Sequence, residues 1–514
     1  MTTDGFILGL DIGTSAVKAV LVDLAQTVRA SASVQLTTSR PCPGWSEQRP
    51  EDWVEAARAA LAQLRTQAAA DFGRVRAIGL SGQMHGAVVL DANGTPLRSA
   101  ILWNDGRAEA ECAGLLAAMP DLPMVAGVPP MPGLTAPKLL WLRKHEPGVF
   151  GRIATVLCPK DFVRLHLTGG RATDMCDAAG TLWLDEARRC WSAEALAASG
   201  LTLEQMPRVI EGTEVSGEVL PALLAEFGWA PGVIVAGSAG DAAAAAAGLG
   251  AIHDGDAFIS LGTSCQLFVS TASYRPRPET LVHAFAHCVA GRWFQMAAML
   301  NGASCLAWAA DVLGRADDID GLLREAALVP PGARGVLFLP YLAGERTPHN
   351  DAAARGVFFG LSASTTAADM TRAVLEGVAY SIREARGVLA SAGTELTEAG
   401  VTGGGTRSAL WLQIICDVSG LPLSRLDGTE LGPAFGAARL ARIALTGEAV
   451  DVVCTKPKVS DRFVPDPGNA AVYAEGFERY RKLYAALRPE FERVAPLSRP
   501  TPALSLPPQG GGDH

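Results

Sequence analysis

The fold is decided by the stretch FILGLDIGTSAVKAVLVD, residues 6–23, in which two apolar runs flank a Gly-Thr-Ser turn. Two such runs joined by a short turn of small residues are typical of a β-hairpin. The pattern returns at residues 257–270, where AFISL precedes a second Gly-Thr-Ser turn and QLFVS follows it. The repeated hairpin predicts a chain built from two related halves.

Between the hairpins, strand-like runs at residues 75–80, 87–90 and 232–236 alternate with helical stretches such as residues 51–70. This alternation is typical of an α/β protein, and 514 residues are too many for one core. The six alanines after Asp241 predict a helix that lies close to other backbone. We predict domains over residues 1–247 and 248–490, followed by a flexible Pro/Gly-rich tail over residues 491–514.

Composition excludes several classes of protein. Apolar residues make up 49% of the chain and charged residues 19%, which is typical of a globular protein. The formal charge of −9 supplies no positive field for nucleic acid. No apolar run approaches the roughly 18 residues of a membrane span. The ten cysteines form no C-x-x-C pair, and the first residues do not resemble a signal peptide. The sequence therefore predicts a cytoplasmic protein that binds neither nucleic acid nor membranes.

Three turns of small residues predict a nucleotide site, although the common phosphate-binding fingerprints G-x-x-x-x-G-K-[ST] and G-x-G-x-x-G are absent. Such turns expose backbone N–H groups and hydroxyls that can hold phosphates. The third turn precedes an apolar run with helical spacing, whose N-terminus would add N–H donors. A flexible β–α connection is an equal alternative for this third turn. The candidate residues are Gly13, Thr14 and Ser15 in the first turn, Thr263 in the second, and Gly404 and Ser408 in the third.

Two aspartates are the candidate catalytic groups. Asp11 ends an apolar strand beside the first turn, and an acid next to phosphates predicts a Mg²⁺ ion held mostly through water. The alternative is a carboxylate that only stabilises the turn. Asp241 follows Gly-Ser-Ala-Gly and precedes the alanine run, so it is either an N-cap or a general base that a substrate hydroxyl can reach.

Polar residues at the ends of two further strands predict a sugar pocket. The segment SGQMHG, residues 81–86, contains Met84 and His85, and ILWNDGR, residues 101–107, contains Trp103, Asp105 and Arg107. Polar groups of this kind can satisfy the hydroxyls of a polyol, while Met and Trp form apolar walls. The alternative is that His85 is a satisfied histidine of the core or a loop and that Trp103 only packs.

With these residues in place, the chain resembles the FGGY carbohydrate kinase family over nearly its whole length. Residues 133–145, GLTAPKLLWLRKH, resemble the first signature of that family, and residues 356–376 resemble the second. Shorter motifs resemble the subgroup that phosphorylates D-xylulose: WSEQ at 45–48, the 81–86 and 101–107 segments, DMCDAAGT at 174–181 and GERTPH at 344–349.

The resemblance implies two RNase H-like domains of the actin and hexokinase type, with a cleft between them. Sugar would bind mainly to the first domain and ATP to the second. Met84 and His85 would contact the sugar, Asp241 would be the catalytic base, and Asp11 would organise Mg²⁺ and phosphate. The residues implied to contact ATP are Thr263, Gly404 and Ser408.

The expected reaction is phosphorylation of D-xylulose at O5 by MgATP. One residue departs from the subgroup pattern, because Ala242 follows Asp241 where an Asn is common. Loss of that amide costs about 1 kcal/mol in sugar recognition and keeps a shifted substrate preference open. The alternatives are a kinase for another ketose or polyol, such as ribulose, glycerol or gluconate, and a sugar sensor without turnover. Relatives often form homodimers, and no residue of the sequence identifies that interface.

Overall fold

The computed structural model describes residues 5–494 of the chain. The first half is built on a mixed sheet in which β1 pairs with β2 in antiparallel and with β5 in parallel orientation. This pairing confirms the predicted hairpin at residues 6–23. In spatial order the strands are β13 (Val215–Glu218), β14 (Ile234–Ala236), β5 (Val75–Gly82), β1 (Phe6–Ile12), β2 (Ala16–Asp23) and β3 (Val28–Gln35), with β15 (Ala239–Gly240) also on β5.

The second half repeats this arrangement. Its hairpin of β16 and β17 is antiparallel, as predicted, and β16 pairs with β22 in parallel orientation. In spatial order the strands are β18 (His283–Ala286), β19 (Trp293–Met299), β17 (Cys265–Thr271), β16 (Ala257–Leu261), β22 (Ala399–Thr402), β23 (Leu423–Leu426) and β24 (Val459–Phe463). Each sheet thus contains an antiparallel hairpin followed by two parallel strands, which confirms an α/β chain with duplicated halves.

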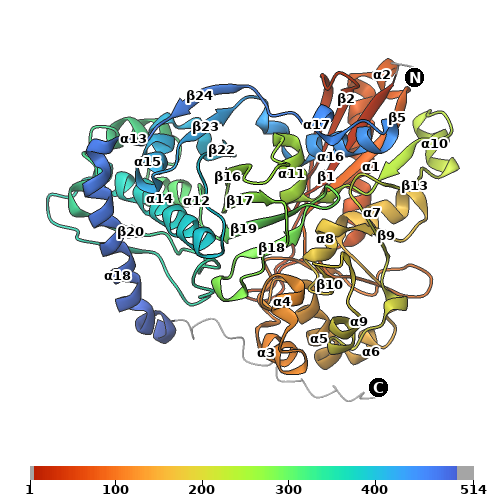
Figure 1. Ribbon diagram of the computed structural model, residues 1–514, viewed down its shortest axis with the longest axis horizontal. Helices are drawn as coiled ribbons and strands as arrows, with labels where there is room; N and C mark the ends of the chain where they lie inside the picture. Colours follow the sequence, from red (N-terminus) through yellow and green to blue (C-terminus); the bar gives the residue numbers. More distant parts are fainter. Residues whose placement is uncertain (1–4, 495–514) are drawn as a thin grey trace, which may run out of the picture.

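Helices cover both sheets, and Figure 1 shows the two halves side by side with α11 between them. The helices before residue 250 are α1 (Pro50–Gln67), α2 (Ala69–Phe72), α3 (Glu109–Ala118), α4 (Leu122–Ala126), α5 (Thr135–His145), α6 (Pro147–Phe150), α7 (Pro159–Thr168), α8 (Met175–Ala179), α9 (Ala193–Ala198), α10 (Pro221–Phe227) and α11 (Asp241–Leu249). Those after it are α12 (Ser304–Val312), α13 (Ile319–Ala326), α14 (Ala367–Ser391), α15 (Ala409–Ser419), α16 (Gly432–Thr446), α17 (Val450–Val453) and α18 (Ala470–Val494).

Helices α11 and α16 are in direct backbone-to-backbone contact where the two halves meet. A Cβ atom on Gly436 would stand 1.7 Å from the carbonyl oxygen of Ala244, so only glycine fits there. The other side of α16 lies on the first sheet, where Cβ atoms on Gly9 and Gly79 would each stand 1.9 Å from an α16 carbonyl. The close approach predicted for the alanine-rich helix is confirmed, and its partner comes from the second half of the sequence.

The predicted tail begins inside α18, because this helix continues to Val494. The remainder of that prediction, residues 495–514, lies outside the described residues. Across residues 5–494, no helix combines the length and the hydropathy that a membrane span requires. All ten cysteines lie in this part of the chain as free thiols.

Candidate active site

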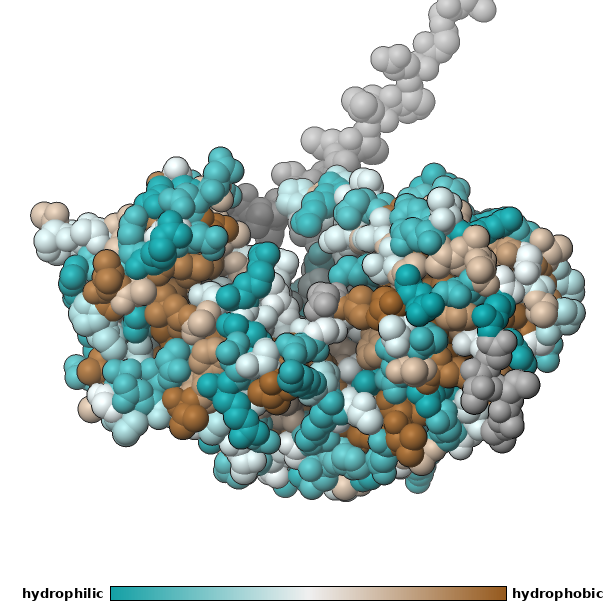
Figure 2. Space-filling model, turned by 90° about the horizontal axis from the view of Figure 1, so that it is seen from above, coloured by the Kyte–Doolittle hydropathy of each residue, from teal (hydrophilic) through white to brown (hydrophobic). Residues whose placement is uncertain are grey.

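A small cavity of about 140 Å³ lies where the two halves meet. Figure 2 shows a recess between the two lobes of the molecule. The first half lines the cavity with Thr14, Met84, His85, Trp103, Asp241 and Ala242, and the second half with Ser264, Gln266, Met296, Ala298, Met299, Leu300 and Arg346. The fold therefore brings five of the residues predicted from sequence to one wall of a single cavity.

Asp241 is the first residue of α11, and the N-cap is Gly240. The prediction that Asp241 itself caps the helix is wrong by one position: its Oδ1 accepts a hydrogen bond from the N–H of the adjacent Ala242 at 2.8 Å. Burial and the negative charge of Asp11 raise the pKa of Asp241 to about 7. A carboxyl with such a pKa alternates between its two protonation states near neutral pH, which is the property of a general base.

Asp11 is buried at the end of β1 and accepts a hydrogen bond from Ser81 Oγ at 3.1 Å. Burial raises the pKa of this carboxyl, and its charge acts on Asp241. Two neighbouring carboxylates repel one another unless a cation lies near both, and carboxylate oxygens together with water are the ligands that Mg²⁺ prefers. The donor set fits the predicted ion, and Asp11 as its ligand stays a prediction.

His85 is held in the left-handed backbone region, with φ at 69°. Its carbonyl oxygen accepts hydrogen bonds from Lys138 Nζ at 2.7 Å and Thr135 Oγ1 at 3.1 Å. Both donors belong to α5, within the segment that resembles the first family signature. Lys138 also donates to the carbonyl of Gly133 at 2.7 Å, and burial lowers the pKa of this lysine to about 7. The signature helix thus fixes the backbone that presents His85 to the cavity.

The ring of His85 has a defined tautomer. Its Nδ1 lies 2.9 Å from the carbonyl oxygen of Gly180, which can only accept, so Nδ1 carries the proton. Burial holds the pKa of the ring well below its usual range, so the imidazole is neutral. A Cβ atom on Gly180 would stand 2.4 Å from Nδ1, so this contact needs glycine. The other nitrogen, Nε2, is therefore a hydrogen-bond acceptor with no partner among the described residues.

A chain of hydrogen bonds joins the first turn to the residues of the first half that line the cavity. Trp103 Nε1 donates to Thr14 Oγ1 at 2.9 Å, and Thr14 donates in turn to Gln83 Oε1 at 2.9 Å. The other two predicted turn residues, Gly13 and Ser15, do not line the cavity. Thr14 is thus the residue of this turn whose side chain faces the space between the halves.

Asp105 and Arg107 do not line the cavity. Two hydrogen bonds, of 2.9 and 2.7 Å, join the guanidinium to the Asp105 carboxylate, and both side chains are 1% exposed. Arg107 also stacks on the ring of Trp45 at 3.6 Å. The polar groups of both side chains thus already have partners within the loop that carries Trp103. This geometry favours a role in positioning that loop over the sugar contact expected from sequence.

The remaining predicted nucleotide residues lie on the second half. Gly403, with φ at 95°, packs so closely on the second hairpin that a Cβ would stand 2.6 Å from the carbonyl oxygen of Leu261. The third turn therefore adjoins the second, and Thr263 and Gly404 are exposed there. Ser408 caps α15 by accepting a hydrogen bond from the N–H of Trp411 at 3.2 Å. Contact of these residues with ATP stays a prediction.

Sequence reasoning assigned no role in the site to Lys138 or Arg346. Both lie in segments, 133–145 and 344–349, that were used only as marks of resemblance. For Lys138 the available signal was a charged residue inside the run Gly-Leu-Thr-Ala-Pro-Lys-Leu-Leu, whereas Arg346 lies among polar residues and gives no such signal. The position of Arg346 in the cavity depends on the pairing of the halves, which a sequence pattern does not specify.

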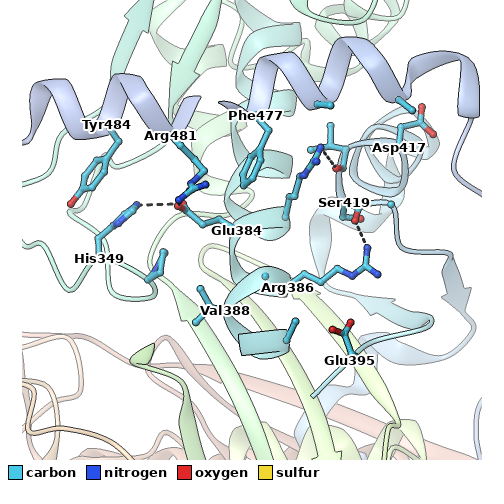
Figure 3. A pocket seen from close by; sticks show the side chains of 18 of the residues that line it. His349, Glu384, Arg386, Val388, Glu395, Asp417, Ser419, Phe477, Arg481 and Tyr484 are labelled. Atoms are coloured by element: carbon cyan, nitrogen blue, oxygen red, sulfur yellow. Dashed lines mark hydrogen bonds and ion pairs between the residues drawn. The ribbon is translucent and has the colours of Figure 1, made fainter. Parts of the chain in front are cut away.

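A larger cavity of about 1070 Å³ lies outside this site, between α14, α15 and α18 (Figure 3). Several of its charged groups already have partners: Arg386 donates to the carbonyl of Ser419 at 2.6 Å, and His349 lies 3.4 Å from Glu384. None of the residues predicted from sequence lines it. We assign no function to this cavity.

Duplicated α/β halves enclose a small cavity that has the Asp241 carboxyl in its wall, and Asp11 acts on that carboxyl from the end of β1. This two-domain α/β architecture is that of the sugar kinases and actin-like ATPases. Residues 6–248 match the N-terminal domain, and residues 257–445 the C-terminal domain, of the FGGY family of carbohydrate kinases. The chain belongs to this family and is a phosphotransferase with an alcohol group as acceptor.

Individual relatives cover nearly the whole chain. The xylulose kinase of Escherichia coli (strain K12) is 44% identical over 484 residues, which are 94% of this chain and 99% of that protein. A solved structure of a xyloylose kinase from Brucella ovis is 46% identical, with a TM-score of 0.90 over 94% of this chain and 100% of that one. The gluconate kinase of Lactobacillus acidophilus is 26% identical, with a TM-score of 0.89 over 96% and 100%.

Proposed function

We propose that this protein transfers the terminal phosphoryl group of MgATP to O5 of D-xylulose. The observation that carries the proposal is Asp241, a carboxyl of raised pKa that faces a cavity lined on one side by Met84, His85 and Trp103. The volume of about 140 Å³ is below the usual range of roughly 300–1,000 Å³ for drug-sized ligands and suits a small sugar. The xylulose kinases among the relatives support the choice of sugar.

In the proposed reaction, Asp241 accepts the proton of the O5 hydroxyl as that oxygen attacks phosphorus. Bound MgATP supplies the phosphoryl group and neutralises the charge that develops on it. Asp11 would hold the ion through water, and the turns at Thr14, Thr263 and Gly404 would position the phosphates. Since such transition states are loose, catalysis depends chiefly on this positioning and on charge neutralisation. We also place the reaction in the cytoplasm, where free thiols such as these ten persist.

A second candidate is a kinase for another small ketose or polyol. It is favoured by Ala242, which places a methyl group in the cavity wall beside Asp241. An apolar wall leaves one sugar hydroxyl without an amide partner and thereby changes the preference among acceptors. The site otherwise offers the same base and the same phosphate turns to either acceptor.

The two candidates differ in their best acceptor. We expect purified protein with MgATP to release ADP fastest with D-xylulose when it is compared with D-ribulose, L-ribulose, L-xylulose, glycerol, gluconate and xylitol. A reaction without sugar is the control. A preference for another acceptor would replace D-xylulose and retain the kinase mechanism. Binding of sugar and ATP without sugar-dependent ADP release would instead indicate a sensor.

A further inference from the structure

The loop that contains Arg346 is fixed to the end of β19, which borders the cavity. Glu345 accepts hydrogen bonds from the backbone N–H groups of Leu300 at 2.7 Å and Arg346 at 2.8 Å. The N–H of Thr347 donates to the carbonyl of Ala298 at 3.1 Å, and its Oγ1 accepts from the N–H of Ala298 at 3.2 Å. Arg346 therefore enters the cavity from a backbone that is held on both sides.

The guanidinium group of Arg346 forms neither a hydrogen bond nor an ion pair with any residue between 5 and 494. Its five N–H donors are thus available to a ligand. A partly buried cation without an acceptor is costly, and two other arginines with buried side chains, Arg107 and Arg164, each have several acceptors. An unpaired guanidinium in the proposed sugar cavity indicates that a ligand supplies the acceptor.

The cavity has a cationic end and an acidic end. A Cβ atom on Gly133 would stand 3.6 Å from Nη2 of Arg346, and Lys138 donates to the carbonyl oxygens of both Gly133 and His85, so the guanidinium lies on the His85 side. The charge that acts on Asp241 is the negative charge of Asp11, so the acidic end of the cavity is at Asp241. A sugar bound with its reacting hydroxyl at Asp241 would therefore direct its other end to His85 and Arg346.

We propose that Arg346 binds the carbonyl oxygen at C2 of an open-chain 2-ketose while Nε2 of His85 accepts a hydrogen bond from the adjacent C1 hydroxyl. This inference rests on the proposed function. A ketone oxygen only accepts hydrogen bonds, and a guanidinium only donates them. Nε2 of His85 only accepts, and the C1 hydroxyl can donate to it. The two side chains thus match the two polar groups at the end of a 2-ketose.

The same pair disfavours a polyol. Reduction of the C2 ketone gives a hydroxyl whose proton faces a group that offers only donors, so this proton lacks an acceptor.

The open-chain form of the sugar is also required by the reaction itself. In the furanose form of a 2-ketopentose, O5 is bonded to C2 and has no proton to transfer. A guanidinium that binds the free C2 carbonyl therefore selects the form in which O5 is a hydroxyl that Asp241 can deprotonate.

The test replaces Arg346 by Met, which preserves length and removes the donors. We expect the KM for D-xylulose to rise about 10- to 100-fold, the factor expected for loss of one hydrogen bond to a charged group. The KM for MgATP should stay within about twofold. The ratio of kcat/KM for D-xylulose to that for xylitol should fall toward one, a change that general damage to the fold would not produce. The matched control is Arg324→Met, at an exposed arginine of α13.

A second variant, Arg346→Lys, keeps the positive charge but has fewer N–H donors in suitable positions. We expect its KM for D-xylulose to lie between those of the unsubstituted protein and Arg346→Met. An unchanged KM for D-xylulose in Arg346→Met, or an equal loss with xylitol, would overturn the inference and leave the proposed function intact. If the unsubstituted protein prefers a different 2-ketose, the same ratio is measured with that ketose and its polyol, and only the proposed sugar fails. If the best acceptor has no ketone, both the proposed function and the inference on Arg346 are contradicted.

Discussion

Replacing Asp241 by Asn lowers kcat about 10²- to 10⁴-fold and leaves the fold intact, because removal of a general base has an effect of this size. Asn preserves the shape of the side chain and cannot take the proton of the sugar hydroxyl. The helix loses no cap, since Gly240 occupies that position. Steady-state rates of ADP release and circular dichroism measure the two effects, with Asp317→Asn, at an exposed aspartate, as the matched control.

The stability of this variant has a predicted sign as well. Since the folded protein raises the pKa of Asp241 to about 7, the stability associated with the neutral carboxyl is lost as the pH rises through that value. Asn removes the buried charge, so at pH 8 the variant should melt at the temperature of the unsubstituted protein or above it. A lower melting temperature together with near-normal turnover would eliminate the base role.

The pH profile of the unsubstituted protein provides an independent readout. A base must be deprotonated, so kcat/KM for the sugar should rise with pH through a pKa near 7 at low MgATP. The positive charge of bound Mg²⁺ favours the carboxylate, so saturating MgATP should move this acid limb to lower pH. If the acid limb does not move with the concentration of MgATP, the group that titrates is not Asp241.

Replacing Gly436 by Ala lowers the free energy of unfolding by about 1–3 kcal/mol or more, the range for overpacking a close contact. The new Cβ would stand 1.7 Å from the carbonyl oxygen of Ala244, and both groups are backbone-anchored within helices. The helices α11 and α16 must then separate, which also displaces Asp241 at the start of α11. Denaturant unfolding measures the loss, and we expect kcat to fall with it.

The matched control is Gly387→Ala in α14, where a Cβ would meet no atom within 4 Å. Since Gly in a helix costs about 1 kcal/mol relative to Ala, this substitution should stabilise the protein. Both variants carry the same substitution, Gly to Ala within a helix, and they differ only in the space around the new methyl group. Equal or greater stability of Gly436→Ala would show that α11 and α16 are not packed as the structure has them.

Local patterns predicted the elements whose partners are near in sequence. The hairpins at residues 6–23 and 257–270 follow from alternating apolar runs around a turn, so their strands pair within one segment. The α16 contact with Gly9 and Gly79 joins positions more than 350 residues apart, and no local periodicity specifies such a pairing. The division at residue 248 therefore stays a prediction, because α16 belongs to the second half and packs on the sheet of the first.

The residues of the site likewise fall into those that a local pattern predicts and those that depend on contacts between distant segments. Met84, His85, Trp103 and Asp241 were predicted because small or polar residues at strand ends mark an open edge, and the structure brings them to one cavity. Asp105 and Arg107 share that local pattern, but each neutralises the other, which their spacing alone does not reveal. Arg346 was missed because the cavity forms only when the second half closes against the first.

The most direct test of the central claim is to identify the product formed from MgATP and D-xylulose by phosphorus and carbon NMR. The account predicts a phosphate monoester on C5, because O5 must lie at Asp241 when the C1 and C2 oxygens occupy His85 and Arg346. A phosphate on C1, or hydrolysis of ATP without a sugar phosphate, would contradict it.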